Sequence, residues 1–337
     1  MKNLNIVTVI NVARTDSPHV EAPFLNQIRA VAPGITVTDA SPYYAGERDG
    51  EAKAKEKMDA VLANADIIVG FMPPRNLLQR APHVKWIQAM SAGVDGLIGS
   101  EVWQSDIIIT GVSGIHAVPI SEYVMMTMLM FAKQSPRAYR QQLKHEWKRY
   151  TPGLLKGRTV GIIGLGHIGR EIARLAKAFG MKVLAVDELR RTRPARNVDK
   201  MVPQGGMIDL FKESDYVVSS VPLTPTTHNL IGENQLKAMK KNAYLINVSR
   251  GGIVDEEALI KALEGKWIAG AGLDVTVREP LPPESPLWQF ENVIITPHSS
   301  GGQEEYIQLA TALFCENLKR YIAGKKLINL INRKRGY

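Results

Sequence analysis

Residues 160–169 read Val-Gly-Ile-Ile-Gly-Leu-Gly-His-Ile-Gly and decide the fold of the second half of this 337-residue chain. The apolar run at its start predicts a buried strand over Thr159–Ile163, and the helical pattern over Ile168–Phe179 stops at Gly180. A G-x-G-x-x-G turn between a strand and a helix is typical of dinucleotide-binding domains. Its first glycine permits the tight turn, its second lets a pyrophosphate approach the backbone, and its third lets the helix pack closely on the strand.

The glycine turn predicts a set of cofactor contacts. Amides and the helix dipole at the start of the helix can hold the negative charge of a pyrophosphate. His167 lies within the turn and either touches the pyrophosphate or is an exposed polar residue. The predicted contacts in the turn are Gly164, Gly166, His167, Ile168 and Gly169.

The end of the next strand bears on which nicotinamide cofactor is bound. Asp187 ends the strand predicted over Lys182–Val186, 18 residues after Gly169, where a carboxylate can accept hydrogen bonds from both ribose hydroxyls. Such a carboxylate would repel a 2′-phosphate, so we expect NAD(H). NADP(H) stays open, because Arg190, Arg191 and Arg193 follow closely and guanidinium groups bind phosphate.

Strands and helices alternate on both sides of this turn, which predicts parallel sheets covered by helices on both faces. Before the turn, we expect strands at Ile6–Ile10, Ile35–Thr38, Ile67–Val69, Trp86–Gln88 and Ile107–Thr110, with helices at Pro23–Ala30, Glu51–Leu62, Leu77–Gln79 and Ile120–Lys133. After it, we expect strands at Tyr216–Ser219, Tyr244–Asn247, Ala269–Leu273 and Val293–Thr296, a helix at Glu256–Leu263, and a last helix through Ile307–Tyr321 that ends at Gly324.

The composition is that of an ordinary globular protein, with 45% apolar and 22% charged residues. At roughly 100–200 residues per domain, this length suggests two domains. The longest apolar stretch, Tyr123–Ala132, is too short to span a bilayer, and the N-terminus lacks the apolar segment of a signal peptide, so no membrane partner is expected. The single cysteine, Cys315, excludes an internal disulfide framework and fits a reducing compartment, so we expect a cytoplasmic protein.

The net charge of +9 is concentrated in two segments. Residues 133–158 carry eight Lys or Arg against one acid, and residues 318–337 carry seven against none. A nucleic-acid-binding surface would combine such charge with stacking aromatic residues or a recognition helix, and the sequence pattern indicates neither. We therefore expect a solvated basic surface that attracts an anionic cofactor and substrate, and no nucleic-acid partner.

A series of further motifs runs in order from about Trp86 to Gly301. They are Ser91-Ala92-Gly93-Val94-Asp95, Gly114-Ile115-His116-Ala117-Val118-Pro119, Val221-Pro222-Leu223-Thr224-Pro225, Asn247-Val248-Ser249-Arg250-Gly251-Gly252, Gly272-Leu273-Asp274-Val275 with Glu279-Pro280, and Thr296-Pro297-His298. Together they resemble the D-isomer-specific 2-hydroxyacid dehydrogenases. The residues before Trp86, which would carry much of the substrate choice, match that family only loosely.

The resemblance implies catalytic roles for Arg250, Glu279 and His298. Reduction of a 2-keto acid builds charge on the keto oxygen, so a fixed cation and a proton donor are needed there. The planar guanidinium of Arg250 can bind the substrate carboxylate and polarise the carbonyl. His298 suits the proton donor, because imidazole gains and loses protons near neutral pH, and Glu279 would orient its ring and favour the protonated form. Taken singly, each would more commonly be a surface cation, a turn residue or a structural histidine.

The resemblance also implies substrate and cofactor contacts outside the glycine turn. The Ala92, Gly93 and Val94 loop exposes backbone amides that can hold a substrate carboxylate, together with Arg250 and His298. Asp274 would bind the nicotinamide carboxamide, although a capping aspartate at a strand end is the alternative. His116 is a weaker candidate for substrate contact, and no cluster has metal-ligand spacing. The implied cofactor contacts are Val221, Pro222, Ser249, Arg250, Asp274 and His298.

We therefore expect two Rossmann-like, doubly wound parallel-sheet domains with a cleft between them. Residues 113–301 would form the NAD-binding Rossmann domain, and residues 1–112 with 302–337 a flavodoxin-like substrate domain. The apolar helix from Ile120 and the arm after it resemble the family's dimerisation region, so we expect a homodimer. The expected activity is NAD(P)-dependent interconversion of a 2-keto acid and a D-2-hydroxy acid. An NAD(H)-sensing binding protein of the corepressor type and a formate or phosphite dehydrogenase are the alternatives.

Overall fold

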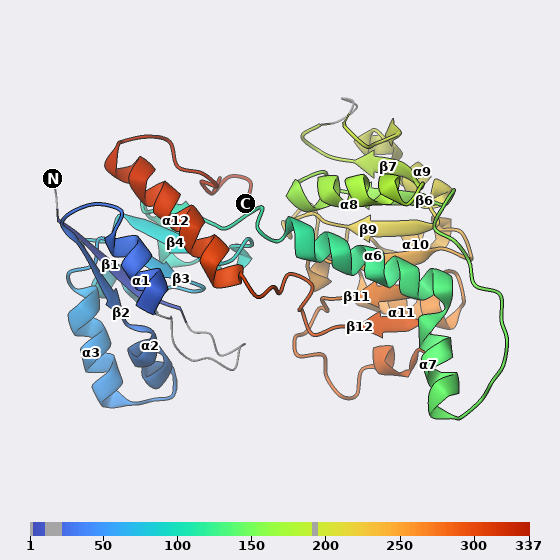
Figure 1. Cartoon of the computed structure of the whole chain (residues 1–337), viewed down its shortest axis with the longest axis horizontal. Helices are drawn as coiled ribbons and strands as arrows, with labels where there is room; N and C mark the ends of the chain where they lie inside the picture. The colour runs from blue at the N-terminus through green and yellow to red at the C-terminus, as the bar shows by residue number, and fades with distance from the viewer. Residues whose placement is uncertain (1–2, 11–21, 191–194) are drawn as a thin grey trace. The chain divides into compact units, whose positions relative to one another are not determined.

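A computed structural model describes residues 3–10, 22–190 and 195–337 of the chain. The chain divides into two compact units. One comprises residues 1–115 and 303–337, and the other comprises residues 116–302 (Figure 1). The chain therefore leaves the first unit once and returns to it through a C-terminal helix.

The first unit is built on a five-stranded parallel sheet. Its strand order, β2-β1-β3-β4-β5, is that of flavodoxin-like domains. Its strands are β1 (Leu4–Val9), β2 (Ile35–Asp39), β3 (Ile67–Gly70), β4 (Trp86–Ala89) and β5 (Ile108–Thr110). Its helices are α1 (Ala22–Arg29), α2 (Ser41–Arg48), α3 (Ala52–Leu62), α4 (Leu77–Arg80), α5 (Glu101–Gln104) and α12 (Tyr306–Ile322).

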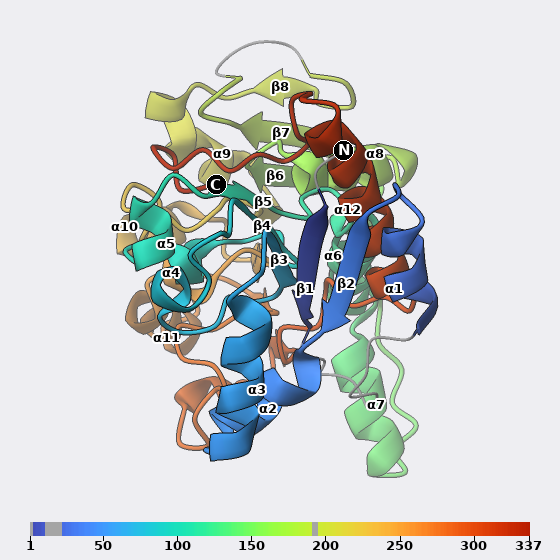
Figure 2. The same ribbon diagram turned by 90° about the vertical axis from the view of Figure 1, so that its left-hand side faces the viewer.

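Both faces of this sheet are covered by apolar packing. Alternate residues of β1 enter different clusters, because successive side chains of a strand point to opposite faces. Ile6 packs with α1 and α12, which lie side by side in Figure 2, whereas Val7 packs with helices α3 and α4. Trp86 is fully buried at the face covered by α12, where its ring lies 5.2 Å from that of Phe314. The returning helix thus completes the first unit.

The second unit is built on a seven-stranded parallel sheet of order β12-β11-β10-β9-β6-β7-β8. Counted within the unit, this is the Rossmann order with one added edge strand. Its strands are β6 (Thr159–Ile163), β7 (Lys182–Val186), β8 (Lys200–Met201), β9 (Tyr216–Ser219), β10 (Tyr244–Asn247), β11 (Gly270–Leu273) and β12 (Val293–Ile295). Its helices are α6 (Ala117–Lys133), α7 (Ser135–Leu143), α8 (His167–Ala178), α9 (Met207–Glu213), α10 (Glu233–Ala238) and α11 (Glu256–Glu264).

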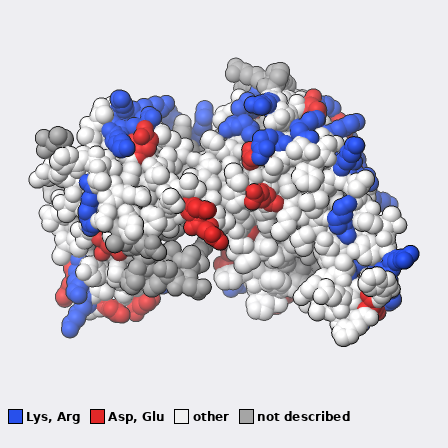
Figure 3. Space-filling view, in the orientation of Figure 1, with Lys and Arg blue, Asp and Glu red and all other residues white. Residues whose placement is uncertain are grey.

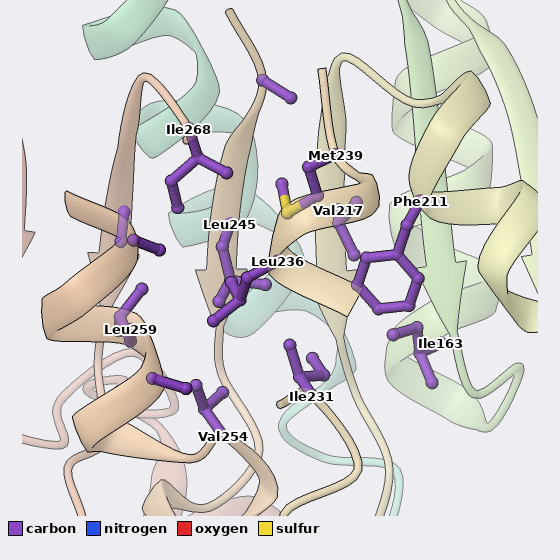
Figure 4. Close-up of a cluster of buried hydrophobic side chains, with 14 of the residues drawn as sticks. Ile163, Phe211, Val217, Ile231, Leu236, Met239, Leu245, Val254, Leu259 and Ile268 are labelled. Carbon is purple, nitrogen blue, oxygen red and sulfur yellow. The ribbon is translucent and has the colours of Figure 1, made fainter. Parts of the chain in front are cut away.

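The two faces of the second sheet have separate cores. Helices α6 and α8 cover one face and pack on residues such as Ile162 and Ile246. Helices α9, α10 and α11 cover the other face, where Phe211 lies beside Ile163 and Val217 (Figure 4). A sheet that is buried on both faces needs nearly continuous apolar strands, and by that pattern the sequence predicted the strands of this sheet other than β8.

The strand order changes direction between β6 and β9, so the connections from these two strands leave on opposite faces. In open α/β sheets, ligands bind outside the carboxyl ends of the strands at such a switch point. The glycine turn follows β6 at this point, and Ser220 and Val221 follow β9. The fold therefore brings two of the predicted cofactor-binding motifs together.

The sequence missed several elements. Helix α7 (Ser135–Leu143) lies in the stretch predicted only as basic and polar, and it has no buried residue. Its polar composition hid the helix, since only a few apolar residues, such as Tyr139 and Leu143, interrupt it. The short strand β8 (Lys200–Met201) and helices α2, α5, α9 and α10 were also not predicted. Over the described residues, the helices are all too short or too polar to cross a membrane.

The basic residues do not form one continuous stripe in the face drawn in Figure 3. Lys and Arg side chains lie there in separate groups, with Asp and Glu between some of them. Of the two basic segments of the sequence, residues 318–337 include the end of α12, and residues 133–158 include α7.

Candidate active site

The predicted catalytic and cofactor residues of the second unit all follow carboxyl ends of its strands. Because the strands are parallel, these ends share one edge of the sheet. That edge carries the turn after β6, Asp187 after β7, Val221 and Pro222 after β9, Ser249 and Arg250 after β10, Asp274 and Glu279 after β11, and His298 after β12.

The glycine turn has the geometry that each glycine position requires. Gly164 has a φ of +95°, a conformation that side-chain-bearing residues rarely adopt. A Cβ atom on Gly169 would lie 2.0 Å from the Gly164 carbonyl oxygen, so only glycine lets α8 pack this closely. Gly166 is exposed, and a Cβ atom there would meet nothing within 4 Å among the described residues. Described atoms therefore leave the surface of Gly166 open, as a close approach by a pyrophosphate would require.

The carboxylate of Asp187 is hydrogen-bonded to the backbone of the glycine turn. Its Oδ2 accepts a hydrogen bond from the Leu165 amide at 2.7 Å, and its Oδ1 accepts from the amides of Leu189 (3.1 Å) and Arg190 (2.8 Å). These three amides therefore hold the negatively charged carboxylate of Asp187 next to the glycine turn. Arg191 and Arg193, which the sequence offered as phosphate ligands, lie outside the described residues.

The remaining predicted cofactor residues line the same edge. Val221 is half-buried and would be 2.8 Å from a Cβ atom on Gly164, while Pro222 is exposed. His167 is exposed as a whole residue, but its partial desolvation and the positive charge of Arg170 lower its pKa. Its ring is therefore neutral near pH 7 and brings no charge to the turn.

Glu279 and His298, separated by 19 residues in the chain, form a hydrogen-bonded pair. The Nδ1 of His298 lies 2.8 Å from Oε2 of Glu279, and the Thr276 amide donates to Oε1 at 3.3 Å. Because a carboxylate only accepts, Nδ1 carries the proton of this bond and Nε2 is the nitrogen that changes its protonation state. Both side chains are 36% exposed, which leaves the ring open to a ligand.

Asp274, directly after β11, is buried and is hydrogen-bonded to the segment that carries His298. Its carboxylate accepts hydrogen bonds from the Thr296 hydroxyl (2.6 Å), the amides of Ser299 (2.9 Å) and Ser300 (3.0 Å), and the Ser300 hydroxyl. These four donors match the roughly four acceptor positions of a carboxylate. The capping role considered from the sequence is thus realised, and contact with a nicotinamide carboxamide stays a prediction.

Arg250 lies in a loop that the buried Asn247 organises. The Asn247 side chain donates to the Arg250 carbonyl at 2.9 Å and accepts from the Ser249 amide at 3.1 Å. The Ser249 hydroxyl lies 2.9 Å from that of Ser219, at the end of the neighbouring strand. A Cβ atom on Gly251 would lie 2.0 Å from the Thr276 carbonyl, so glycine lets this loop pack on the one leading to Glu279.

His116, at the start of α6, lies near both Arg250 and His298. Burial, with the positive charges of Arg250 and His298, lowers the pKa of His116 to about 4. The His116 ring also lies against Gly301, where a Cβ atom would come within 2.8 Å of it. Side chains from three separate segments therefore gather here around a neutral imidazole.

The predicted carboxylate loop belongs to the first unit. Ala92, Gly93 and Val94 follow β4, and the Ser91 hydroxyl donates to the Gly93 carbonyl at 2.8 Å. Val94 is 5% exposed and anchors the loop in the core, while Ala92 and Gly93 are half-buried. A strand end at the carboxyl edge is where this fold class places ligand loops.

Sequence reasoning missed the polar residues that support these groups. Asn247, Thr296 and Ser300 were quoted within motifs or left aside, and none was given a role. Asn247 and Thr296 had a signal in the sequence, a polar residue at or directly after the end of a predicted strand, where a loop needs hydrogen-bond partners. Ser300, farther along the loop, had none.

The sequence of this chain is similar to a known enzyme family. Residues 125–300 match the family model described as D-isomer specific 2-hydroxyacid dehydrogenase, NAD binding domain. A glyoxylate reductase from Korarchaeum cryptofilum is 36% identical over 265 residues, which are 77% of this chain and 79% of that protein.

Two solved structures are similar to the whole chain. One, a D-isomer specific 2-hydroxyacid dehydrogenase family protein from Aeromonas salmonicida, has a TM-score of 0.84 at 29% identity and covers 98% of this chain and 100% of its own. The other is a D-isomer specific 2-hydroxyacid dehydrogenase from Xanthobacter autotrophicus, in complex with NADPH. It has a TM-score of 0.83 at 28% identity and covers 100% of both chains.

Proposed function

The chain belongs to the D-isomer-specific 2-hydroxyacid dehydrogenase family, and from this premise we propose that Arg250, Glu279 and His298 carry its reaction. The chain is an NAD(P)-dependent oxidoreductase that interconverts 2-keto and 2-hydroxy acids. The observation that carries the proposal is the 2.8 Å contact between His298 Nδ1 and Glu279, at the sheet edge that also holds Arg250.

His298 is the proposed acid and base. With Nδ1 held on Glu279, the protonated ring presents an N–H at Nε2 that can donate a proton to the keto oxygen of a substrate. Glu279 offsets the positive charge of this form and fixes the orientation of the ring. In the opposite direction, the neutral ring accepts the hydroxyl proton at Nε2. Reduction therefore needs the protonated ring and oxidation the neutral one.

Arg250 is the proposed substrate cation. Its guanidinium can bind one carboxylate oxygen and the keto oxygen of the same substrate, which fixes the acid and stabilises the charge that develops on the keto oxygen. In the first unit, the amides of Ala92, Gly93 and Val94 are the proposed second support for the carboxylate. A small 2-keto acid such as glyoxylate, hydroxypyruvate or pyruvate suits these groups, and the Korarchaeum relative is named for glyoxylate.

A nicotinamide cofactor supplies the hydride when it is bound. We propose that the turn Gly164–Gly169 holds its pyrophosphate and that Asp187 favours NAD(H) over NADP(H), with Val221, Pro222, Ser249 and Asp274 as further contacts. The carboxylate of Asp187 supports this preference, because it lies beside the glycine turn and would repel a 2′-phosphate. The similar Xanthobacter protein was solved with NADPH, so the preference needs its own measurement.

Turnover tests the proposed function. The rate of reduction is measured with purified protein and glyoxylate, hydroxypyruvate, pyruvate or larger 2-keto acids, with NADH and NADPH in separate assays. His298→Asn should lower kcat at least about 10²-fold and leave NADH binding within twofold of wild type. Arg250→Lys should chiefly raise KM for the keto acid, because an ammonium group lacks the two-pronged geometry. Tight NADH binding without turnover of any acid would instead support the binding-protein alternative.

The helix α6 and the arm after it support a proposed homodimer. Several apolar side chains here are exposed in the single chain, among them Trp147 (94%), Leu143 (64%) and Tyr139 (61%). Exposed apolar patches of this kind mark interaction sites in soluble proteins. Sedimentation should give about twice the 37.2 kDa chain mass, and Trp147→Glu with Leu143→Glu should halve it. A monomeric wild-type enzyme with full activity would contradict the homodimer.

A further inference from the structure

One buried carboxylate holds the whole segment that carries His298. Besides its carboxylate bonds to Thr296, Ser299 and Ser300, Asp274 accepts the His298 amide at its own backbone carbonyl, at 2.8 Å. Residues on both sides of His298 are thus tied to one residue at the end of β11. Asp274 is 2% exposed, so water competes little for these bonds.

His298 needs this support because of its backbone conformation. Its φ is +51°, in the left-handed region that costs a side-chain-bearing residue roughly 1–2 kcal/mol. Such a conformation persists only when the surrounding structure imposes it. Here the hydrogen bonds of the His298, Ser299 and Ser300 amides to Asp274 fix the chain through the turn. This backbone conformation directs the imidazole of His298 toward Glu279.

The network continues from Asp274 into helix α6. The Thr296 hydroxyl lies 2.6 Å from the Asp274 carboxylate and 2.9 Å from the Tyr123 hydroxyl. Burial raises the pKa of Tyr123, so its hydroxyl keeps its proton at working pH. The Tyr123 hydroxyl can therefore donate its proton to Thr296 Oγ1, while the Thr296 hydroxyl donates its own proton to the Asp274 carboxylate.

We propose that Thr296, Ser300 and Tyr123 are positioning residues for the reaction, acting through Asp274 to hold His298 in the orientation that pairs it with Glu279. This inference rests on the proposed function of His298. None of the three residues needs to touch substrate or cofactor. Their loss lets the 296–300 segment relax from the left-handed turn, and the imidazole then leaves its bond to Glu279.

The experiment compares deletions of hydroxyl groups within the second unit, at the buried Ser300 and at the half-buried Thr296. Ser300→Ala and Thr296→Val remove donors to Asp274. Ser214→Ala is the control for Ser300→Ala, because Ser214 is also a buried serine of the second unit but its hydroxyl donates to the Leu210 carbonyl, at 2.6 Å, and not to Asp274. Each protein is assayed for kcat on a 2-keto acid, for the Kd of NADH, and for thermal stability.

A second measurement reads His298 without turnover. The chain has seven histidines, so labelling with ¹⁵N-imidazole histidine gives few signals, and His298→Asn identifies the one of interest. In wild type, the Nδ1 proton of His298 should be protected from exchange by its bond to Glu279. In Ser300→Ala and Thr296→Val it should exchange faster, whereas in Ser214→Ala it should not change.

The expected result is a split between rate and binding. Ser300→Ala and Thr296→Val should lower kcat about tenfold, because small misplacements of a reacting group carry large rate penalties, with the Kd of NADH within twofold of wild type. A variant that keeps wild-type kcat and a protected His298 proton would overturn the proposal, as would a loss confined to NADH affinity. If Thr296→Val does not fold, Tyr123→Phe probes the same end of the network.

The proposed function and the positioning role can fail separately. If the wild-type enzyme reduces no 2-keto acid, the proposed function fails, and the exchange of the His298 proton alone decides the positioning role. If wild type is active and the proton stays protected in Ser300→Ala and Thr296→Val, the positioning role fails and the proposed function stands.

Discussion

Two alanine substitutions in the glycine turn should separate cofactor binding from folding. A Cβ atom on Gly169 would lie 2.0 Å from the Gly164 carbonyl oxygen and 3.1 Å from the Ser220 hydroxyl. Ordinary contact begins near 3.4 Å, so in Gly169→Ala the start of α8 must move away from the turn by about 1.4 Å. In Gly166→Ala the added methyl group meets no described atom within 4 Å.

The magnitudes follow from these geometries. Overpacking costs typically 1–3 kcal/mol, and at Gly169 the obstacle is backbone, so we expect about 3 kcal/mol of lost stability. For a domain of this size that corresponds to a Tm lower by about 6–12 °C. Gly166 has a φ of −66°, which alanine can also adopt. Alanine lowers the conformational entropy of the unfolded chain, and this stabilisation roughly offsets the poorer helix cap, so the free energy of unfolding should change by no more than about 0.5 kcal/mol.

Thermal unfolding without cofactor and fluorescence titration with NADH measure the two effects. Gly169→Ala should unfold at the lower temperature. Gly166→Ala should keep its Tm within about 2 °C of wild type but raise the Kd of NADH at least about tenfold, because the methyl group occupies the space over the turn. The reasoning is refuted if Gly166→Ala binds NADH as well as wild type, or if Gly169→Ala is as stable as wild type.

Three further changes test the charges of the site. Glu279→Gln should lower kcat for reduction about 10²-fold with NADH affinity unchanged, because the neutral amide no longer offsets the protonated ring; steady-state rates beside a fluorescence titration check this. Asp187→Asn should raise the Kd of NADH by up to about tenfold and lower the Kd of NADPH. Titrations with both cofactors check this, and an unchanged ratio of the two Kd values would contradict the role of Asp187 in NAD(H) preference. The pKa of His116 falls from 6.5 to about 4, so the unfolded state binds its proton more readily between these values, and stability is lost as pH falls through that window. Wild type should lose about 3 kcal/mol more than His116→Gln between pH 7 and 4 in denaturant titrations, and equal losses would show that the ring is not held neutral.

The sequence predicted most strands because they are buried on both faces. Strands such as β6, β7, β9 and β10 are short continuous apolar runs bounded by turn residues, and their predicted bounds agree with the structure. Helix α7 was missed because it is short and rich in polar and basic residues, and because its few apolar side chains, such as Tyr139 and Leu143, are exposed and not part of the core. Local pattern therefore found nearly all of the strands, but it missed the exposed helix α7 and also the short helices α9 and α10, although Phe211 and Leu236 of these two helices are fully buried.

What the sequence determined by itself is the local chemistry: a glycine turn between strand and helix, an acid after the next strand, and the motifs that carry Arg250, Glu279 and His298. These features depend on neighbours in the chain, so spacing reveals them. Tertiary structure alone decided that Glu279 and His298 meet at 2.8 Å and that His298 adopts a left-handed conformation on Asp274. Such contacts depend on the register of β11 beside β12, which side-chain packing across the whole sheet sets and no local pattern records.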